Sequence, residues 1–178
     1  SKEKPTNSDI VISVPDSANV AGVGFSEESK IPYEIGFIRN HYIGRTFIEP
    51  RQEIRDFGVK IKYNPVGETL KGKAIVLVDD SIVRGTTSKK LIKMLRKTGV
   101  KKIHHRIGSP PIKCPCFYGI DTPKMSKLIA ANKSVKEIKE FFGVDTLQYL
   151  SLEGLIKATG MKKENFCLAC FTGVYPIK

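Results

Sequence analysis

The chain has 178 residues, of which 40% are hydrophobic and 27% are charged. This length and composition suit one domain with a hydrophobic core and exclude an intrinsically disordered chain. Lysine and arginine outnumber aspartate and glutamate by 30 to 18, which gives a net charge of +12. Such a balance fits nucleic acid, an acidic partner or a multiply phosphorylated small substrate. The sequence shows no helix-turn-helix signature and no aromatic ribonucleoprotein motif, so we expect no nucleic-acid partner.

The apolar pattern and the first residues of the chain predict its cellular compartment and the state of its cysteines. No apolar run approaches the roughly 18 residues of a membrane-spanning helix. The first residues, SKEKPTNSD, lack the apolar stretch of a secretory signal and an initiator methionine. We therefore expect an N-terminally truncated, cytoplasmic chain without membrane contact, in which the cysteines are not paired as disulfides.

The N-terminal part of the chain predicts a strand, a loop and a helix in that order. Residues 9–14, DIVISV, have the character of a strand. A Pro-Asp-Ser loop then leads into the small-residue segment NVAGVGFSE, which can open a helix. The loop either binds an anion at the helix start or is an ordinary turn. Residues 31–38 predict a second strand.

A basic segment without clear periodicity follows at residues 39–64. A segment of this length without regular structure is usually functional or disordered. We expect a flexible flap that covers a phosphate-rich substrate and keeps water away from the reacting atoms. The alternative is a solvated basic loop.

The other elements are organised around residues 74–88, AIVLVDDSIVRGTTS. The apolar run 74–78 predicts a strand buried on both faces of a parallel sheet. Ligands bind beyond the carboxyl ends of such strands. The small-residue loop before the predicted helix 89–98 offers backbone N–H groups and hydroxyls that suit a phosphate.

Two adjacent acids, Asp79 and Asp80, lie where this strand ends. Because carboxylates repel phosphate, a neutral or positively charged group must lie between the two acids and a bound phosphate. Ribose hydroxyls and Mg²⁺ both meet that need. The alternative is that the acids only end the strand and face water. We favour a ligand site, since two acids and a phosphate-binding loop occur together.

Strands and helices alternate through the rest of the chain, which predicts an α/β fold with a mostly parallel sheet flanked by helices on both faces. Adjacent His104 and His105 would face opposite sides of a strand, and we interpret both as structural. No Ser-His-Asp arrangement is evident. The later elements are predicted as strands at 101–108 and 146–150 and helices at 124–132, 134–142 and 152–159.

The cysteines lie in two segments, Cys114 with Cys116 and Cys167 with Cys170. The second pair has the C-x-x-C spacing of a redox pair, half a zinc site or a cluster site. Four thiolates could hold a structural zinc, although the C-x-C spacing is tight for that metal. The spacing alone does not decide between these alternatives.

Several motifs resemble one family. VDDSIVRGTTS resembles the signature of the type I phosphoribosyltransferases, which use phosphoribosyl pyrophosphate (PRPP). Four further segments resemble the glutamine-dependent amidophosphoribosyltransferases of the cluster-containing, Bacillus-like type: NHYIGRTFIEP, VKIKYN, SPPIKCPCFYGID and CLACFTGVYP. The resemblance covers residues 9–176. It implies a type I phosphoribosyltransferase fold for the single domain 1–178, with a cysteine-containing tail at 160–178.

The resemblance also implies roles for individual residues. Asp79, Asp80, Arg45 and Lys62 would be catalytic. Asp79 and Asp80 would also hold magnesium together with Ser17. Three cysteines, Cys116, Cys167 and Cys170, would ligate a 4Fe-4S cluster. Its fourth family ligand would lie upstream, unless Cys114 substitutes. Substrate would be bound by Tyr42, Ser81, Ile82, Val83, Arg84, Gly85, Thr86, Thr87 and Ser88.

The implied reaction converts PRPP, glutamine and water to phosphoribosylamine, pyrophosphate and glutamate, the first committed step of purine synthesis. The family's glutaminase domain and its nucleophilic cysteine are absent from this sequence, so the chain alone would at most use ammonia. The resemblance further implies feedback by purine nucleotides and a homo-oligomer, a tetramer in full-length form.

Two other functions stay open at this point. One is a PRPP-sensing regulator with the same fold that binds nucleic acid through its basic charge. The other is a non-enzymatic metal or cluster module built on the cysteines.

Overall fold

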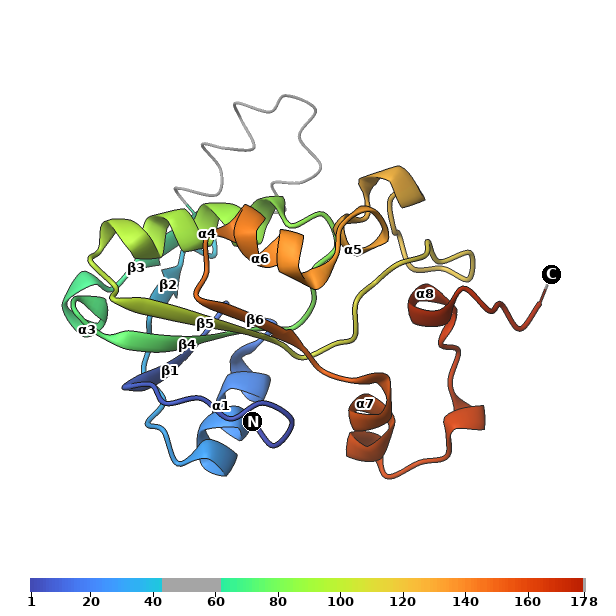
Figure 1. The fold of residues 1–178 in the computed structure, drawn as a ribbon, viewed down its shortest axis with the longest axis horizontal. Helices are drawn as coiled ribbons and strands as arrows, with labels where there is room; N and C mark the ends of the chain where they lie inside the picture. The colour runs from blue at the N-terminus through green and yellow to red at the C-terminus, as the bar shows by residue number, and fades with distance from the viewer. Residues whose placement is uncertain (43–61, 178) are drawn as a thin grey trace.

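A four-stranded parallel sheet forms the centre of the computed structural model, which describes residues 1–42 and 62–177 (Figure 1). Its strand order is β1-β4-β5-β6, and each strand pairs in parallel with its neighbour. The predicted α/β class with a mostly parallel sheet is therefore confirmed. The strands are β1 (Ile10–Ser13), β4 (Ala74–Asp79), β5 (Lys102–Ile107) and β6 (Thr146–Tyr149).

Helices cover both faces of this sheet. Helices α4 (Thr86–Lys97) and α6 (Val135–Phe142) lie on one face, and α1 (Asn19–Ser29) and α7 (Leu152–Thr159) lie on the other side (Figure 1). The shorter helical segments are α3 (Gly67–Leu70), α5 (Ile129–Asn132), α8 (Ala169–Thr172) and the 3-10 turns η2 (Met125–Lys127) and η3 (Lys163–Asn165).

The main core lies between the sheet and helices α4 and α6. Strand side chains such as Ile12 and Leu77 pack there against Leu91, Ile92 and Ile138, all fully buried or nearly so. A smaller cluster on the opposite face joins Val11, Phe25, Val76 and Val78 beneath α1. Because β4 is buried by both clusters, its residues are almost all apolar, as a central parallel strand requires.

Two predicted elements differ in the structure. The strand expected at 31–38 is reduced to β2 (Phe37–Arg39), and Tyr33 makes only an isolated bridge to Val11. Strand β2 pairs antiparallel with β3 (Tyr63–Pro65), outside the main sheet. The helix expected at 124–132 is divided, because Leu128 between η2 and α5 has an extended backbone.

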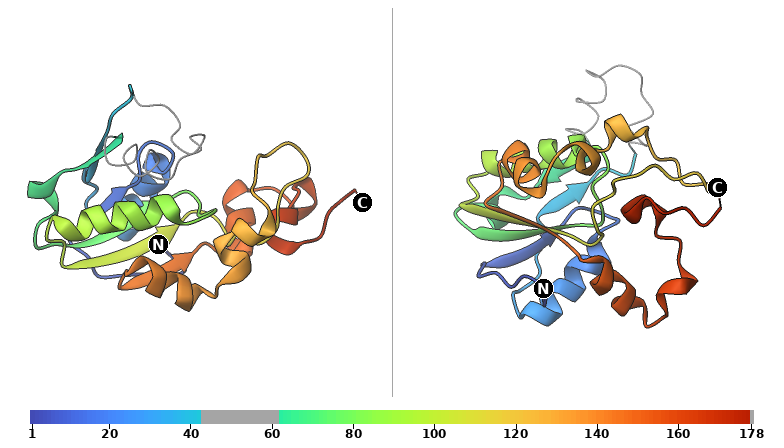
Figure 2. Two further views of the ribbon diagram at one scale, coloured as in Figure 1. Left: turned by 90° about the horizontal axis from the view of Figure 1, so that it is seen from above. Right: turned by 45° about the vertical axis from the view of Figure 1, so that its right-hand side comes forward.

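The cysteine segments form a small extension at one end of the sheet. Residues 109–124 and the tail 160–177 lie side by side there (Figure 2). The backbone N–H groups of Lys113 and Cys114 both donate to the carbonyl of Cys170. The hydroxyl of Tyr175 donates to the carbonyl of Pro115 at 2.7 Å. These bonds bring cysteines more than 50 residues apart in sequence into one region.

Candidate active site at the carboxyl end of strand β4

A cavity of about 340 Å³ lies where β4 ends and α4 begins. We call it the Asp79 cavity. Asp79 is the last residue of β4, and the loop 80–85 carries the chain from the strand to the helix. The cavity is lined by Val14, Ser17, Tyr63, Asp79, Asp80, Ser81, Ile82, Val83, Arg84, Gly85, Thr86, Thr87, Ser88, Asp121 and Pro123.

Gly85 allows the turn from this loop into α4. Its φ of +74° lies in the left-handed region, which side chains disfavour. A Cβ at this position would stand 2.8 Å from Cδ1 of Ile129 and 3.1 Å from the ring of Phe142. No side chain caps the helix start, so its first N–H groups remain available to an anion, and the helix dipole favours one. Thr86 and Thr87 lie exposed in that first turn.

Asp79 is held almost completely out of water, at 6% relative exposure. Its Oδ1 accepts a bond from the backbone N–H of Asp80 at 3.0 Å, and its Oδ2 accepts one from Oγ of Ser88 at 3.3 Å. Burial, reinforced by the negative charge of the neighbouring Asp80, raises the pKa of Asp79 to about 8. The site therefore favours a cation or hydroxyl donors beside this carboxylate.

Asp80 differs from its neighbour because it is exposed. Its Oδ1 accepts a bond from the backbone N–H of Ser81 at 2.8 Å, which fixes the start of the loop. One buried and one exposed carboxylate thus share one side of the cavity, and the helix start lies on another. A ligand with both hydroxyl and phosphate groups would match both sides.

A second buried titratable group stands behind Asp79. His105 on β5 is fully buried, and its Nε2 lies 3.9 Å from Oδ2 of Asp79. Burial, with a smaller effect from Arg106, lowers the pKa of His105 to about 3. Its imidazole is therefore neutral at ordinary pH. His104 lies on the other face of the strand and is half-buried beside Thr146.

Most of the predicted site residues are brought together by the fold. Ser17, from the loop after β1, lines the same cavity as Asp79 and Asp80 although the sequence separates them by about 60 residues. The hydroxyl of Ser88, predicted to bind phosphate, is instead bonded to Asp79. Ile82 packs its side chain in the main core, so only its backbone faces the cavity.

Two predicted residues of the described part of the chain, Tyr42 and Lys62, are not in the cavity lining. Tyr42 is fully exposed and lies outside it. Lys62 is buried, with Nζ 5.7 Å from the ring centroid of Tyr63, and does not line it either. Arg45 and most of the predicted flap 39–64 lie outside the described residues, so their roles stay predictions.

Sequence reasoning missed Tyr63, Asp121 and Pro123 as cavity residues. Asp121 ends the quoted motif SPPIKCPCFYGID, so the motif itself was the available signal. Tyr63 belongs to β3, whose pairing with β2 places it near the loop after β1. Burial raises the pKa of the Tyr63 phenol, and the acids of this region add to the effect.

The chain is similar to known proteins over nearly its whole length. No family model matches it. It is 54% identical over 176 residues to amidophosphoribosyltransferase 1, chloroplastic, of Arabidopsis thaliana, and 50% identical over 179 residues to the amidophosphoribosyltransferase of Bacillus subtilis. These matches cover 99% and 98% of the chain. The chain is homologous to the phosphoribosyltransferase region of amidophosphoribosyltransferases.

Solved structures agree with this assignment. The B. subtilis glutamine PRPP amidotransferase, solved in complex with ADP and GMP, superposes with a TM-score of 0.87 at 50% identity. That match covers 98% of the chain and 39% of the solved one. The chain spans only 31% to 38% of the two relatives named above. The structural match to the B. subtilis enzyme confirms the type I phosphoribosyltransferase fold.

The cysteines that resemble the cluster ligands of amidophosphoribosyltransferases are free thiols in this structure. Burial and the proximity of the other three cysteines raise the pKa of Cys170. Among residues 1–42 and 62–177, no group of three His, Cys, Asp or Glu side chains has a geometry that could hold a metal ion. The two segments are thus adjacent, but their thiols do not converge on one point.

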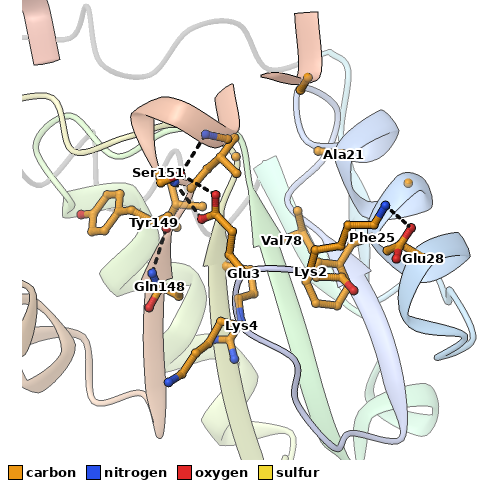
Figure 3. A pocket seen from close by; sticks show the side chains of 18 of the residues that line it. Lys2, Glu3, Lys4, Ala21, Phe25, Glu28, Val78, Gln148, Tyr149 and Ser151 are labelled. Atoms are coloured by element: carbon orange, nitrogen blue, oxygen red, sulfur yellow. Dashed lines mark hydrogen bonds and ion pairs between the residues drawn. The ribbon is translucent and has the colours of Figure 1, made fainter. Parts of the chain in front are cut away.

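A larger cavity of about 770 Å³ lies on the α1 side of the sheet, and we call it the N-terminal cavity (Figure 3). Phe25 of α1 and Val78 of β4 give it apolar walls. Two of its three acids already have partners: Lys2 pairs with Glu28 at 3.4 Å, and the carboxylate of Glu3 accepts bonds from Ser151 at the start of α7. It contains none of the residues that the amidophosphoribosyltransferase motifs predict for substrate.

None of the helices in the described ranges has the length and apolar character needed to cross a membrane.

Proposed function

We propose that this chain is the phosphoribosyltransferase part of an amidophosphoribosyltransferase. It would bind PRPP and transfer its phosphoribosyl group to ammonia, released from glutamine in the complete enzyme, in the first step of purine synthesis. The observation that carries the proposal is the Asp79 cavity, which combines two carboxylates with an uncapped helix start. The homology to amidophosphoribosyltransferases supports the same activity and not a nucleic-acid-binding regulator.

The two sides of the cavity assign the parts of PRPP. The 5′-phosphate would lie at the start of α4, where N–H groups and the hydroxyls of Thr86 and Thr87 can donate to it. The ribose hydroxyls would donate to the carboxylates of Asp79 and Asp80, both of which line the cavity. Ser17, across the cavity, would lie beside the pyrophosphate. This arrangement exposes the anomeric carbon between the two phosphate groups.

Magnesium fits this donor set. Hard oxygen ligands from carboxylates and substrate phosphates suit Mg²⁺, and Asp79, Asp80 and Ser17 offer such oxygens at one cavity. Burial raises the pKa of Asp79, so a cation bound beside it would favour its ionised form. When bound, the metal would offset the charge of the departing pyrophosphate.

The proposed transfer reaction depends on positioning and electrostatic stabilisation, and it needs no covalent intermediate with the protein. Ammonia would attack the anomeric carbon as its bond to the pyrophosphate oxygen breaks, and the two electrons of that bond leave with pyrophosphate. The acids near the ribose would favour the positive charge that develops on the sugar. Arg45 and Lys62, with Tyr42, are proposed to reach the site when substrate binds.

Three further features are proposed from the homology. Cys116, Cys167 and Cys170 would ligate an iron–sulfur cluster, which requires their segments to rearrange from the conformation described here. Purine nucleotides would act as feedback ligands, as the ADP and GMP bound to the B. subtilis enzyme suggest. The complete protein would form a homo-oligomer.

Calorimetric titration with PRPP in the presence of MgCl₂ tests the proposal. We expect saturable, magnesium-dependent binding to the wild-type chain. The double variant Asp79→Asn, Asp80→Asn should lose at least 30-fold in affinity, because it removes both carboxylates that accept the ribose hydroxyls.

Stability measurements separate binding from folding in this test. Asp79→Asn removes a buried charge, so the double variant should melt no lower than the wild type at pH 8. The matched control is Glu164→Gln, an exposed acid in η3 outside the Asp79 cavity, which should bind PRPP normally. Equal affinity of the double variant and the wild type would remove the acids from the site and contradict the proposal.

A further inference from the structure

The buried imidazole of His105 is the feature of the core that the proposed function does not use. Its side chain faces the α4 and α6 side of the sheet, at 0% exposure. Its partners in register are Leu77 on β4 and Leu147 on β6, so it interrupts a row of aliphatic residues. The ring packs edge-on against Phe142, with 5.8 Å between centroids.

Neither ring nitrogen of His105 has a hydrogen-bond partner within the described part of the chain. A polar group buried in this way reduces the stability of the fold, and an aliphatic side chain would fill the same row without that penalty. The carboxylate of Asp79 lies close to the ring, with 3.9 Å between Nε2 and Oδ2. A shift of about 1 Å would bring these atoms to hydrogen-bonding distance.

We propose that His105 is a positioning residue for Asp79: its neutral imidazole donates Nε2–H to Oδ2 when Asp79 binds the ribose of PRPP. The inference rests on the proposed function. Asp79 would then be held by three donors, since the backbone N–H of Asp80 already bonds Oδ1 and Oγ of Ser88 bonds Oδ2. The third donor comes from the core behind the carboxylate, leaving the cavity side free for the ribose hydroxyls.

Two variants of His105 separate positioning from packing. His105→Gln keeps an N–H donor at about the reach of Nε2, and His105→Leu fills the space without any donor. We expect the leucine variant to bind PRPP with Mg²⁺ about tenfold more weakly, and the glutamine variant to stay within about threefold of wild type. The leucine variant should nevertheless unfold at an equal or higher temperature, because it removes a buried polar group.

The control lies on the opposite face of the same strand. His104 is half-buried and bonded to Thr146, away from Asp79, so His104→Gln should leave PRPP affinity unchanged. Wild-type affinity in His105→Leu, or equal losses in both His105 variants, would overturn the inference. A merely structural role would lower stability and affinity together.

The tautomer of His105 tests the inference without PRPP. Long-range ¹H–¹⁵N spectra of the imidazole in the ligand-free chain should show the neutral form protonated at Nε2. Protonation at Nδ1 instead would overturn the inference, whatever the chain binds. Conversely, a wild-type chain that shows this tautomer but binds no PRPP would contradict the proposed function and not the geometry around His105.

Discussion

The two cavities of this molecule differ in a way that their sizes do not reveal. The N-terminal cavity has more than twice the volume of the Asp79 cavity, about 770 Å³ against about 340 Å³. Two of the three acids that line it nevertheless have partners within the chain, because Glu3 bonds Ser151 and Glu28 pairs with Lys2 (Figure 3). In the Asp79 cavity burial opposes the charge of Asp79, and no side chain caps the helix start. Uncompensated groups therefore identify the candidate site better than volume does.

The two cavities also differ in how their polar groups affect the free energy of folding. Around the N-terminal cavity, polar contacts stabilise the fold, since Glu3 supplies a negative charge at the start of α7. Around the Asp79 cavity, burial works against the ionised forms of Asp79 and His105, whose pKa values move to about 8 and about 3. Sites for ligands are often arranged in this way, with free energy of folding given up in favour of binding. Three variants, from the largest expected effect to the smallest, test this contrast.

Gly85→Ala should give the largest effect, on both stability and binding. The left-handed φ costs about 1 kcal/mol for a non-glycine residue, and the Cβ contacts at 2.8 and 3.1 Å add about 1–3 kcal/mol of overpacking. We expect a total loss of about 2–4 kcal/mol in urea unfolding. PRPP affinity should also fall, because the start of α4 must shift.

A matched glycine isolates the packing contribution. Gly72 has nearly the same φ, +76°, but no heavy atom lies within 4 Å of its added Cβ. Gly72→Ala should therefore lose only about 1 kcal/mol and bind PRPP normally. Equal losses of stability in the two variants would show that Ile129 and Phe142 do not constrain the loop.

The second prediction concerns acid stability and His105. The folded-state pKa of about 3 lies below the ordinary value of 6.5, so between these values the unfolded chain binds a proton that the folded chain does not. The stability contributed by the neutral imidazole is therefore fully present above pH 6.5 and is lost as pH falls toward 3. Between pH 6.5 and pH 5 the loss is about 2 kcal/mol.

Asp79 has the opposite dependence over part of this range, since its raised pKa makes the folded carboxyl retain a proton. The informative quantity is therefore the difference between wild type and His105→Gln, in which residue 105 cannot titrate. Urea unfolding at pH 5, 6 and 7 should show the wild type losing stability relative to the variant as pH falls. A constant difference across this range would mean that His105 is not buried in its neutral form.

Much of this arrangement could be predicted from local sequence signals. The apolar run 74–78 and the small-residue loop after it predicted strand β4 and the loop that lines the Asp79 cavity before α4, because strand burial and helix starts have local signatures. The start of α6, within the predicted helix 134–142, also has a local signature, since Ser134 and Glu137 form a capping box with both of its hydrogen bonds. Such features depend on residues only a few positions apart.

Other features depended on contacts that no local pattern encodes. Tyr63 lies on β3, which pairs with β2 outside the main sheet, and no local pattern indicates that pairing. His105 was interpreted as structural, and its position beside Asp79 follows from the register of β4 and β5. Asp121 lay within a motif noted for its cysteines, so its place in the cavity was overlooked.

The smallest expected effect belongs to the N-terminal cavity. The carboxylate of Glu3 accepts the backbone N–H of Ser151 at 2.9 Å and also bonds its hydroxyl, while Oγ of Ser151 caps α7 by accepting from Gly154. Glu3→Gln keeps the side-chain shape and removes the charge. Because the contact is exposed, we expect a loss of only about 0.5 kcal/mol in urea unfolding.

The same variant decides whether the two cavities are independent. Glu3 lies on the α1 side of the sheet, and the Asp79 side chain lies on the α4 side, with the strands between them. Glu3→Gln should therefore leave the calorimetric affinity for PRPP with Mg²⁺ unchanged. Glu28→Gln breaks the ion pair with Lys2 and should also leave that affinity unchanged. If either variant weakened PRPP binding while the chain stayed folded, the N-terminal segment would have to act on the Asp79 cavity through the sheet. The satisfied acids of the larger cavity would then have a role in binding, and the contrast between the two cavities would fail.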